Sequence, residues 1–522
     1  MPSMSDQQRH INPWLIAVSV MFATFMEVLD TTVVNVSLPH IAGSLSSTID
    51  EATWALTSYL VANAIILPMT GWLASTFGRK RLIMGAVLGF TASSFLCGLA
   101  PNLASLVVFR IIQGATGGVM QPLSQAVLLE AFPPKDRGKA MGFWGLGIVV
   151  APILGPVLGG WLTDTYSWRW VFYINIPVGM ASLVMTQLYI FDPPYLKANA
   201  GRGVDYWGIG MLAVGIGALQ FVLDKGQQDD WFESNLITIL AVVSAVSLVA
   251  LVVHQLTSRA PIVDLRVFKV RSYAVGVFLM TIVGFVMYGS MVLLPIMLQT
   301  LLGYPPLQAG IALAPRGLGS FIMMPMTGAL VGRVDARKLL TIGLVVGGGT
   351  MIWLSRMNLN AGYWDLFWPQ VIQGMAMSML FVPMTTIAMD AIPREQMGYA
   401  TSLFSLMRNI GGSVGIAMTS TLLARHTQQT TSLYGANVTA MDPTSQALFY
   451  QMRGAFMAAG ADITTATDRA YAALFGMVMR QASIVSFVGL FQILGIVFLV
   501  VTPLVLLMKR PRASSGASAA AH

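Results

Sequence analysis

Charged residues are scarce in this 522-residue chain, because Asp, Glu, Lys and Arg together make up only 10% of it, whereas soluble proteins carry about 25%. Hydrophobic residues make up 55%, and the mean hydropathy is +0.70. A water-soluble core cannot bury that much apolar surface, so the composition excludes a soluble enzyme. The repeated long apolar runs predict a polytopic membrane protein with the lipid bilayer around it.

Cysteine is nearly absent as well. Cys97, the single cysteine, lies in an apolar run, which excludes an internal disulfide and a cysteine-based metal cluster. The chain also lacks the nucleotide-binding pattern Gly-x-x-x-x-Gly-Lys-Ser/Thr and the zinc pattern His-Glu-x-x-His. We therefore expect no enzymatic activity, no metal and no cofactor. The net charge of +8 comes from short basic clusters between apolar runs, so nucleic acid is not an expected partner.

Fourteen apolar segments are long enough to cross a bilayer, for which about 20 residues are needed. The first begins at Pro13, carries Glu27 and Asp30, and is too long for a signal-peptide core, so we expect an uncleaved helix. The predicted fold class is an all-α polytopic membrane protein with fourteen transmembrane helices. These helices are expected at residues 13–37, 53–74, 82–101, 103–127, 139–163, 170–191, 205–224, 235–256, 272–300, 307–331, 338–356, 363–389, 398–423 and 481–508.

Basic residues are distributed unevenly between the two sides of the predicted membrane. The cluster at 79–81 and the one after the last helix fall on the same side, together with most other Lys and Arg residues of the short loops. Because short cytoplasmic loops are enriched in Lys and Arg, both tails, residues 1–12 and 509–522, are predicted to be cytoplasmic. The expected location is the bacterial cytoplasmic (inner) membrane, and residues 424–480 are expected to form a long periplasmic or extracellular loop.

The sequence contains an internal repeat. The tetrapeptide Pro-Met-Thr-Gly at 68–71 recurs at 325–328, an offset of 257 residues, and Gln113-Gly114 recurs as Gln373-Gly374 at an offset of 260. Two six-helix bundles in the same orientation, residues 13–191 and 272–508, with an inserted helix pair at 205–256, account for this spacing. Parallel repeats of this kind suit a rocking mechanism that opens a central cavity alternately to either side of the membrane.

Several motifs resemble those of the major facilitator superfamily, and specifically its fourteen-helix drug:proton antiporter branch, the EmrB/QacA type. Residues 29–39 resemble the first-helix motif of that branch, and Ser75 stands where the superfamily usually has an aspartate. The motif of the loop between helices 2 and 3 is matched by Gly71, Gly78, Arg79, Lys80 and Arg81, and the antiporter signature of the fifth helix by Gly147, Pro152, Gly155, Pro156 and Gly159.

This resemblance implies proton-driven export of lipophilic, often cationic, compounds by alternating access. The proton gradient then supplies the energy, and no cofactor is needed. A dedicated exporter of a metabolite, siderophore, lipid or antibiotic is the alternative, because the residue types expected around the cavity do not separate the two. The glycines and prolines of the fifth helix are expected either to let helices bend during rocking or to allow static close packing.

Asp30 is the first candidate for proton coupling. A carboxylate deep in the bilayer costs a few kcal/mol, and burial favours its neutral, protonated form. Arg110 on the fourth helix lies at a similar depth, so the two side chains are expected to pair. We predict that Asp30 alternates between a proton and either Arg110 or a cationic substrate. Glu27, three residues earlier on a neighbouring part of the same helical face, is a second acidic candidate.

The expected substrate cavity involves Asp30, Gln113, Arg316 and Arg408. The last two are arginines at mid-membrane depth in the second half, where no carboxylate occupies the position that matches Asp30. They are expected either to attract anionic substrates or to bond to backbone carbonyls and neighbouring helices. Proton coupling is therefore predicted to depend on the first half.

The polar segment 424–480 contains helix-like apolar spacing around 447–457 and 470–479. The resemblance implies two further partners for this segment, a periplasmic membrane-fusion adaptor and an outer-membrane channel. A loop without a partner is the alternative.

Overall fold

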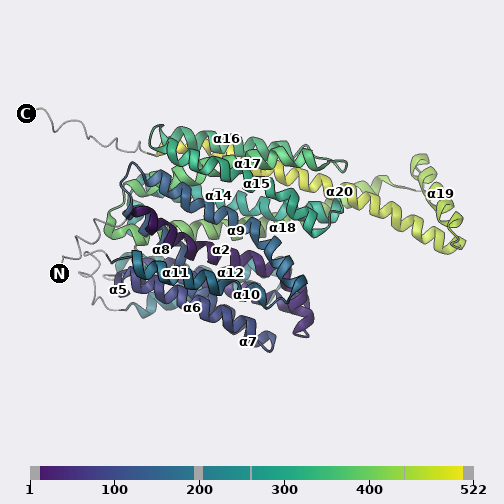
Figure 1. The fold of residues 1–522 in the computed structure, drawn as a ribbon. Helices are drawn as coiled ribbons and strands as arrows, with labels where there is room; N and C mark the ends of the chain where they lie inside the picture. The colour runs from purple at the N-terminus through teal and green to yellow at the C-terminus, as the bar shows by residue number, and fades with distance from the viewer. Residues whose placement is uncertain (1–11, 193–203, 259–260, 440, 509–522) are drawn as a thin grey trace, which may run out of the picture.

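The computed structural model describes residues 12–192, 204–258, 261–439 and 441–508. Over these residues the chain is helical and contains no β-strand, as the predicted all-α class requires. Most helices run along one common direction and form a bundle, from which α19 projects at one end (Figure 1). The two predicted cytoplasmic tails lie outside the described residues, except for Asn12, whose side chain caps the first helix.

The first half of the bundle runs from α2 to α11. Its elements are α2 (Pro13–Ser44), α3 (Ile49–Ala52), α4 (Trp54–Ile66), η1 (Leu67–Met69), α5 (Thr70–Phe77), α6 (Arg79–Leu99), α7 (Leu103–Gly117), α8 (Met120–Ala131), α9 (Arg137–Thr165), α10 (Trp170–Tyr173) and α11 (Asn175–Tyr189). The insert that follows consists of α12 (Tyr206–Lys225), η3 (Trp231–Glu233) and α13 (Asn235–Thr257).

The second half runs from a short connecting turn to the last helix. Its elements are η4 (Leu265–Lys269), α14 (Arg271–Ile296), η5 (Met297–Leu301), α15 (Pro306–Val331), α16 (Ala336–Leu354), α17 (Tyr363–Asp390), η6 (Arg394–Gln396), α18 (Met397–Asn437), α19 (Pro443–Ala458), α20 (Ile463–Val501) and η7 (Thr502–Leu507).

Twelve of the described helical stretches are long and apolar enough to cross a membrane, whereas the sequence predicted fourteen crossings. The two remaining predicted crossings are α15 and α18, which are 26 and 41 residues long but less apolar. Each carries an arginine within the predicted crossing, Arg316 or Arg408. Helix α15 packs on α9 and α17, whereas α18 packs on α14 and α20. Helices that face other helices tolerate polar residues better than helices that face lipid, which explains their composition.

The glycines of α9 let this helix lie directly against α2. A Cβ atom added at Gly155 would come within 2.1 Å of Thr32 Oγ1, and one added at Gly159 within 2.8 Å of the Val33 carbonyl oxygen. Pro152 and Pro156 lie inside the same helix. Gly147 likewise lies against Met21, since an added Cβ there would lie 2.9 Å from Met21 Cγ. The fifth-helix motif is therefore a close-packing surface for α2 in this structure.

The two halves meet through two matching glycine contacts. An added Cβ at Gly71 would lie 2.7 Å from the Tyr399 backbone nitrogen, and one at Gly398 would lie 3.3 Å from Gly71 Cα. In the reciprocal contact, an added Cβ at Gly138 would lie 2.7 Å from the Gly328 carbonyl oxygen. These positions are related by the sequence repeat, since 71 matches 328 and 138 matches 398. The repeat thus produces a pseudo-symmetric pair of backbone contacts at the end of the bundle that carries the basic loops.

The inserted pair bridges the halves at the opposite end. Helix α12 packs on α13, on α4 of the first half and on α18 of the second half. Lys225 Nζ donates to Thr53 Oγ1 at 3.0 Å, and Ser413 Oγ donates to Gln220 Oε1 at 2.9 Å. Because α12 holds side chains of both halves, relative movement of the halves must change at least one of these contacts.

Asp205 joins the other ends of α12 and α13. Its Oδ1 accepts from the Gly208 N–H at 2.9 Å and lies 2.8 Å from His254 Nε2, and its Oδ2 accepts from Gln255 Nε2 at 3.0 Å. Burial alone would raise the pKa of Asp205, but these three partners together lower it. The bonds therefore stabilise the fold above the ordinary pKa of the carboxyl group, and the contribution is lost as pH falls through the lowered pKa.

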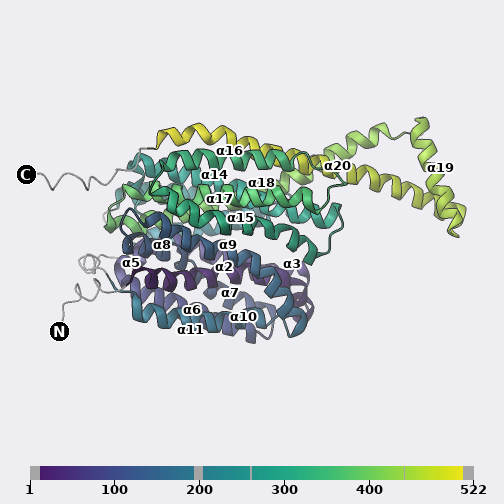
Figure 2. The same cartoon turned by 45° about the horizontal axis from the view of Figure 1, so that its top comes forward.

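The described residues of the segment 424–480 form a helical extension. Helix α18 continues to Asn437, α19 covers Pro443–Ala458, and α20 begins at Ile463, so the apolar spacing noted at 447–457 and 470–479 lies within helices. Figures 1 and 2 show this extension projecting beyond the bundle at the end remote from α5. Its helices α19 and α20 pack together, with the Phe449 and Tyr471 ring centroids 4.5 Å apart.

Replacing Gly328 by leucine should force the two halves apart at the glycine contacts, because overpacking costs about 1–3 kcal/mol. Opening can be followed with a single cysteine introduced by Ser405→Cys in a Cys97→Ala background, because Ser405 is buried in this structure. We expect water-soluble maleimide to label that cysteine about tenfold faster in the Gly328→Leu protein. Gly349→Leu is the matched control, since an added Cβ there meets nothing within 4 Å. Equal labelling rates in both variants would contradict the conclusion that the glycine contacts hold the two halves together.

Candidate functional site

Asp30 and Arg110 form an ion pair inside the first half. Arg110 Nη1 donates to Asp30 Oδ2 at 2.6 Å, and both side chains are 0% exposed. The pairing predicted from their depths on α2 and α7 is therefore present. Two charges without access to water are expensive to separate, because the unpaired charge would remain in a low-dielectric interior.

Two amide side chains complete the surroundings of the Asp30 carboxylate. Gln113 Nε2 donates to Asp30 Oδ1 at 3.0 Å, and Asn175 Nδ2 donates to the same oxygen at 2.8 Å. Gln113 also accepts from Arg110 Nη1 through its Oε1 at 2.7 Å, so one amide bridges the arginine and the carboxylate. Asn175, which the sequence analysis did not assign to the site, is fully buried at the start of α11.

Arg110 is held on its other sides by the first-half helices. Its Nε donates to the Ala55 carbonyl oxygen at 2.8 Å, and its guanidinium carbon lies 4.2 Å from the centroid of the Tyr59 ring. Gly114, one residue after Gln113, allows α7 to approach α4, since an added Cβ would lie 2.3 Å from the Tyr59 carbonyl oxygen. The guanidinium Nη2 atom is buried without a hydrogen-bond partner among the described residues. The arginine is therefore well positioned yet retains donor capacity.

Glu27 lies one turn from Asp30 and belongs to a different network. Asn63 Nδ2 donates to Glu27 Oε1 at 3.0 Å, while Oε2 is buried without a hydrogen-bond partner among the described residues. Glu27 also interacts electrostatically with Arg408 of the second half. Arg408 Nη2 in turn donates to Gln121 Oε1 at 2.6 Å. Glu27 thus faces the junction of the halves, whereas Asp30 is enclosed within the first half.

Aromatic side chains lie on the same junction. The rings of Trp144 on α9 and Phe381 on α17 stack with centroids 6.0 Å apart, and the Arg408 guanidinium carbon lies 5.9 Å from the Phe381 centroid. Trp144 is fully buried and donates through Nε1 to Thr24 Oγ1 at 3.2 Å. The centre of the protein therefore combines acidic, basic and aromatic groups contributed by both halves.

Arg316 does not join this central network. Its Nε donates to Gln370 Oε1 and its Nη2 to Gln373 Oε1, each at 2.9 Å. Both glutamines lie on α17 and are fully buried. The candidates for the substrate cavity therefore divide into three separate groups, around Asp30 with Gln113, around Arg408 and around Arg316.

The loop motif between α5 and α6 is a network of its own at the end of the bundle. Arg79 binds the Glu130 carboxylate through two bonds of 2.5 and 2.7 Å. Gly78 has a positive φ of 83°, and an added Cβ would lie 2.8 Å from Asp192 Oδ2, so glycine is required there. Asp192, which the sequence did not single out, accepts from the Lys80 backbone N–H at 2.9 Å.

Lys80 and Arg81 of this motif lie outside the Arg79–Glu130 ion pair. Lys80 Nζ donates to the Gln187 carbonyl oxygen at 2.6 Å, and Arg81 is exposed. Ser75, in place of the usual aspartate, has its Oγ 3.5 Å from Tyr399 Oη. The motif therefore contacts the second half through a neutral hydrogen bond.

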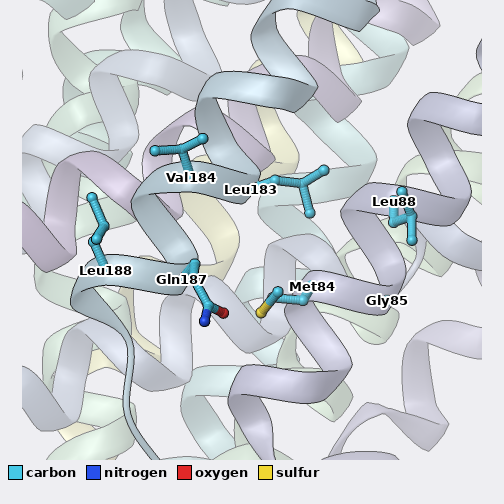
Figure 3. Close-up of a pocket in the computed structure, with 7 residues that line it drawn as sticks. All are labelled: Met84, Gly85, Leu88, Leu183, Val184, Gln187 and Leu188. Atoms are coloured by element: carbon cyan, nitrogen blue, oxygen red, sulfur yellow. The ribbon is translucent and has the colours of Figure 1, made fainter.

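A hollow on the outer surface is distinct from these networks. It lies between α6 and α11 and is lined by apolar side chains and the Gln187 side chain (Figure 3). Leu88 and Val184 are each 59% exposed there, as expected of a surface in contact with acyl chains. Among the described residues, no group of three or more His, Cys, Asp or Glu side chains is arranged to hold a metal ion.

Comparisons with known proteins agree on one family of membrane transporters. The sequence profile described as Major Facilitator Superfamily matches residues 20–416. The "Multidrug export protein EmrB" of Haemophilus influenzae is 41% identical over 445 residues, which cover 84% of this chain and 86% of that protein. The "Multidrug export protein EmrB" of Escherichia coli is 35% identical over 509 residues, covering 97% of this chain and 98% of that protein.

A solved structure shows the same fold. The human organic anion transporter MFSD10 (TETRAN) superposes with a TM-score of 0.57 at 13% identity, and the match covers 94% of this chain and 100% of that chain. Identity this low carries information about the fold alone.

Removing both members of the buried ion pair should destabilise the protein by less than the sum of the two single removals. We expect Arg110→Ala or Asp30→Ala each to cost about 3–5 kcal/mol, since each leaves an uncompensated buried charge, and the double variant to cost clearly less than the sum. Thermal unfolding of the four purified proteins in detergent measures this coupling. Additive losses would show that the pair contributes no mutual stabilisation.

Proposed function

The chain belongs to the Major Facilitator Superfamily, and we propose that it exports lipophilic, often cationic, compounds across the bacterial inner membrane in exchange for protons. The names of two relatives that cover most of the chain support multidrug export, which we favour over a dedicated metabolite exporter. The single observation that carries the coupling part of the proposal is the fully buried Asp30 carboxylate, with its ion pair to Arg110.

In this proposal Asp30 is the proton site. A proton on the carboxylate removes its attraction to Arg110, whose Nη2 has no hydrogen-bond partner among the described residues and whose guanidinium lies over Tyr59. Arg110 then interacts more weakly with α2, which carries Asp30 and packs on α9. Neutralisation at Asp30 is thereby linked to the packing of the helices that must move during rocking.

Glu27 is the acidic group we assign to cationic substrates. It faces the junction of the halves, retains an unpartnered carboxylate oxygen and has Trp144 and Phe381 in the same central region. Aromatic faces and a carboxylate together favour lipophilic cations. Asp30 is enclosed by Arg110, Gln113 and Asn175, so a substrate reaches Glu27 more directly than Asp30.

The topology that we propose places α15 and α18 among the membrane crossings, which makes fourteen in all. Both chain termini then lie on the side of the basic loops, the cytoplasm, and the helical extension lies in the periplasm. The glycine contacts between the halves are then cytoplasmic contacts, which must separate when the transporter opens inward.

The helical extension is the surface that we propose for a periplasmic adaptor, which connects the transporter to an outer-membrane channel. On α20, Tyr471, Phe475 and Met479 follow one another at intervals of four residues and are 60%, 58% and 46% exposed. Residues spaced by four lie on one face of a helix, so they form a continuous apolar stripe beyond the bundle. Large exposed apolar patches mark interaction surfaces.

Asp30→Asn should abolish proton-driven efflux, because the amide cannot take up and release a proton. Fluorescent lipophilic cations are added outside everted vesicles that contain wild type or variant, with and without an imposed proton gradient. We expect gradient-dependent movement in the wild type and at least a tenfold loss in the variant. Asp164→Asn is the control, since the Asp164 side chain is 74% exposed and lies outside the network. Full coupling in Asp30→Asn would refute the assigned proton site.

Replacing Phe475 and Met479 by serine should prevent adaptor binding while leaving vesicle efflux intact, because the apolar stripe lies outside the bundle. Co-purification of the wild type and the double variant with an adaptor encoded by the same host measures this. Thr464→Ala, a change at an exposed polar site on the same helix, is the matched control. Equal recovery of the adaptor with all three proteins would exclude the stripe as the docking surface.

A further inference from the structure

The inserted helix α12 lies between the two halves at one end of the stretch Trp54–Phe77, which consists of α4, η1 and α5. Helix α18 of the second half packs on η1 and α5, and α12 packs on both α18 and α4. At the α5 end the two halves meet backbone to backbone through Gly71 and Tyr399. At the α4 end the inserted helix links the halves instead.

The contacts of α12 with the first half include charged groups. Thr57 Oγ1 donates a hydrogen bond to the Asp224 carboxylate, and Lys225 Nζ donates to Thr53 Oγ1 at 3.0 Å. Lys225 Nζ also lies 5.9 Å from the centroid of the Trp54 ring. Hydrogen bonds with an ionised donor or acceptor are about twice as strong as neutral ones. Helix α12 is therefore held firmly on α4.

The hydrogen bonds from the insert to the second half join neutral groups. Ser413 Oγ of α18 donates to Gln220 Oε1 at 2.9 Å. Trp231 Nε1, in the turn that follows α12, donates to Thr421 Oγ1 of α18 at 3.0 Å. We refer to these two bonds as the latch. Because neutral bonds are the weaker ones, the latch is what gives way when the two halves move relative to each other.

The Trp231 bond depends on an unusual backbone conformation. Asp230 and Trp231 have φ values of 53° and 55°, in the left-handed region that residues with a Cβ atom disfavour. The Trp231 ring folds back over Gly226, where an added Cβ would lie 2.7 Å from Trp231 Cε3. Strained backbone persists where the surrounding contacts fix it, and it is concentrated in functional segments. The strain here places the indole against α18.

We propose that the latch stabilises the conformation in which the cytoplasmic side is closed, and that α12 moves with the first half when the latch opens. This inference rests on the proposed alternating-access export and gives the inserted pair a role in it. The latch and the glycine contacts lie at opposite ends of the interface between the halves. A rigid-body rotation that separates the glycine contacts therefore also shifts α18 relative to α12. Loss of the latch then favours the conformation that is open to the cytoplasm.

The first test needs no substrate. In the Cys97→Ala, Ser405→Cys protein in proteoliposomes, the rate of maleimide labelling measures opening of the cytoplasmic side. Ser413→Ala combined with Thr421→Val removes both latch bonds and should speed labelling about fivefold or more, since each hydrogen bond contributes modestly to stability. Thr57→Val removes a bond of α12 to the first half and is the matched control, with no change expected. An unchanged rate without the latch would overturn the inference, as would equal acceleration by Thr57→Val.

The second test uses a short bifunctional methanethiosulfonate in the Cys97→Ala protein. Cross-linking Gln220→Cys to Ser413→Cys should lower rhodamine 6G export about tenfold or more, and reduction should restore it, because alternating access requires the halves to move. Cross-linking Lys225→Cys to Thr53→Cys, between α12 and the first half, should leave export unchanged. Export that survives the first cross-link, or that both cross-links block equally, would overturn the inference. Failure of the folded wild type to export rhodamine 6G would instead refute the proposed cation export, while the labelling rates would still decide on the latch.

Discussion

A charge buried in a bilayer must find its counter-charge inside the protein, and the arrangement of this molecule follows from that constraint. Asp30 and Arg110 are fully buried and 2.6 Å apart, and the amides of Gln113 and Asn175 complete the shell of the carboxylate. The ion pair thereby connects four helices. Three of them are α2, α7 and α11, and the fourth is α4, whose Ala55 carbonyl oxygen accepts from Arg110. Neutralising the carboxylate would weaken its bonds to α7 and α11 together, whereas the Arg110 bond to α4 does not involve the carboxylate.

The helices and the central pair could be predicted from the sequence because both follow from simple periodic rules. Apolar length gave the helix positions, and equal depth on two helices gave the Asp30–Arg110 contact. The second partners Asn175 and Asp192 could not be predicted, since their roles depend on how α11 and the chain after it pack against α2 and α6. Twelve stretches rather than fourteen meet the apolar criterion, because α15 and α18 carry arginine and other polar residues within their length.

The tertiary structure also separates the two acidic candidates that the sequence placed on neighbouring parts of one helix. Glu27 and Asp30 are one turn apart, yet Glu27 bonds to Asn63 and faces Arg408, whereas Asp30 bonds within its own half. Residues on neighbouring parts of one helix can face different partners, and only the packing of the other helices decides which. The repeat has likewise diverged at its centre: the backbone contacts of the two halves remain matched, while the charges beside them do not.

The length of α18 has a mechanical consequence. This helix runs without interruption through 41 residues, about 60 Å, from Gly398 at the glycine contact between the halves to Asn437 in the extension. A stiff rod of that length acts as a lever, so a tilt of about 10° at the contact, comparable to rigid-body rotations in other proteins, would displace the far end by about 10 Å. A molecule bound to the extension would therefore be displaced in each transport cycle by much more than the residues at the glycine contact.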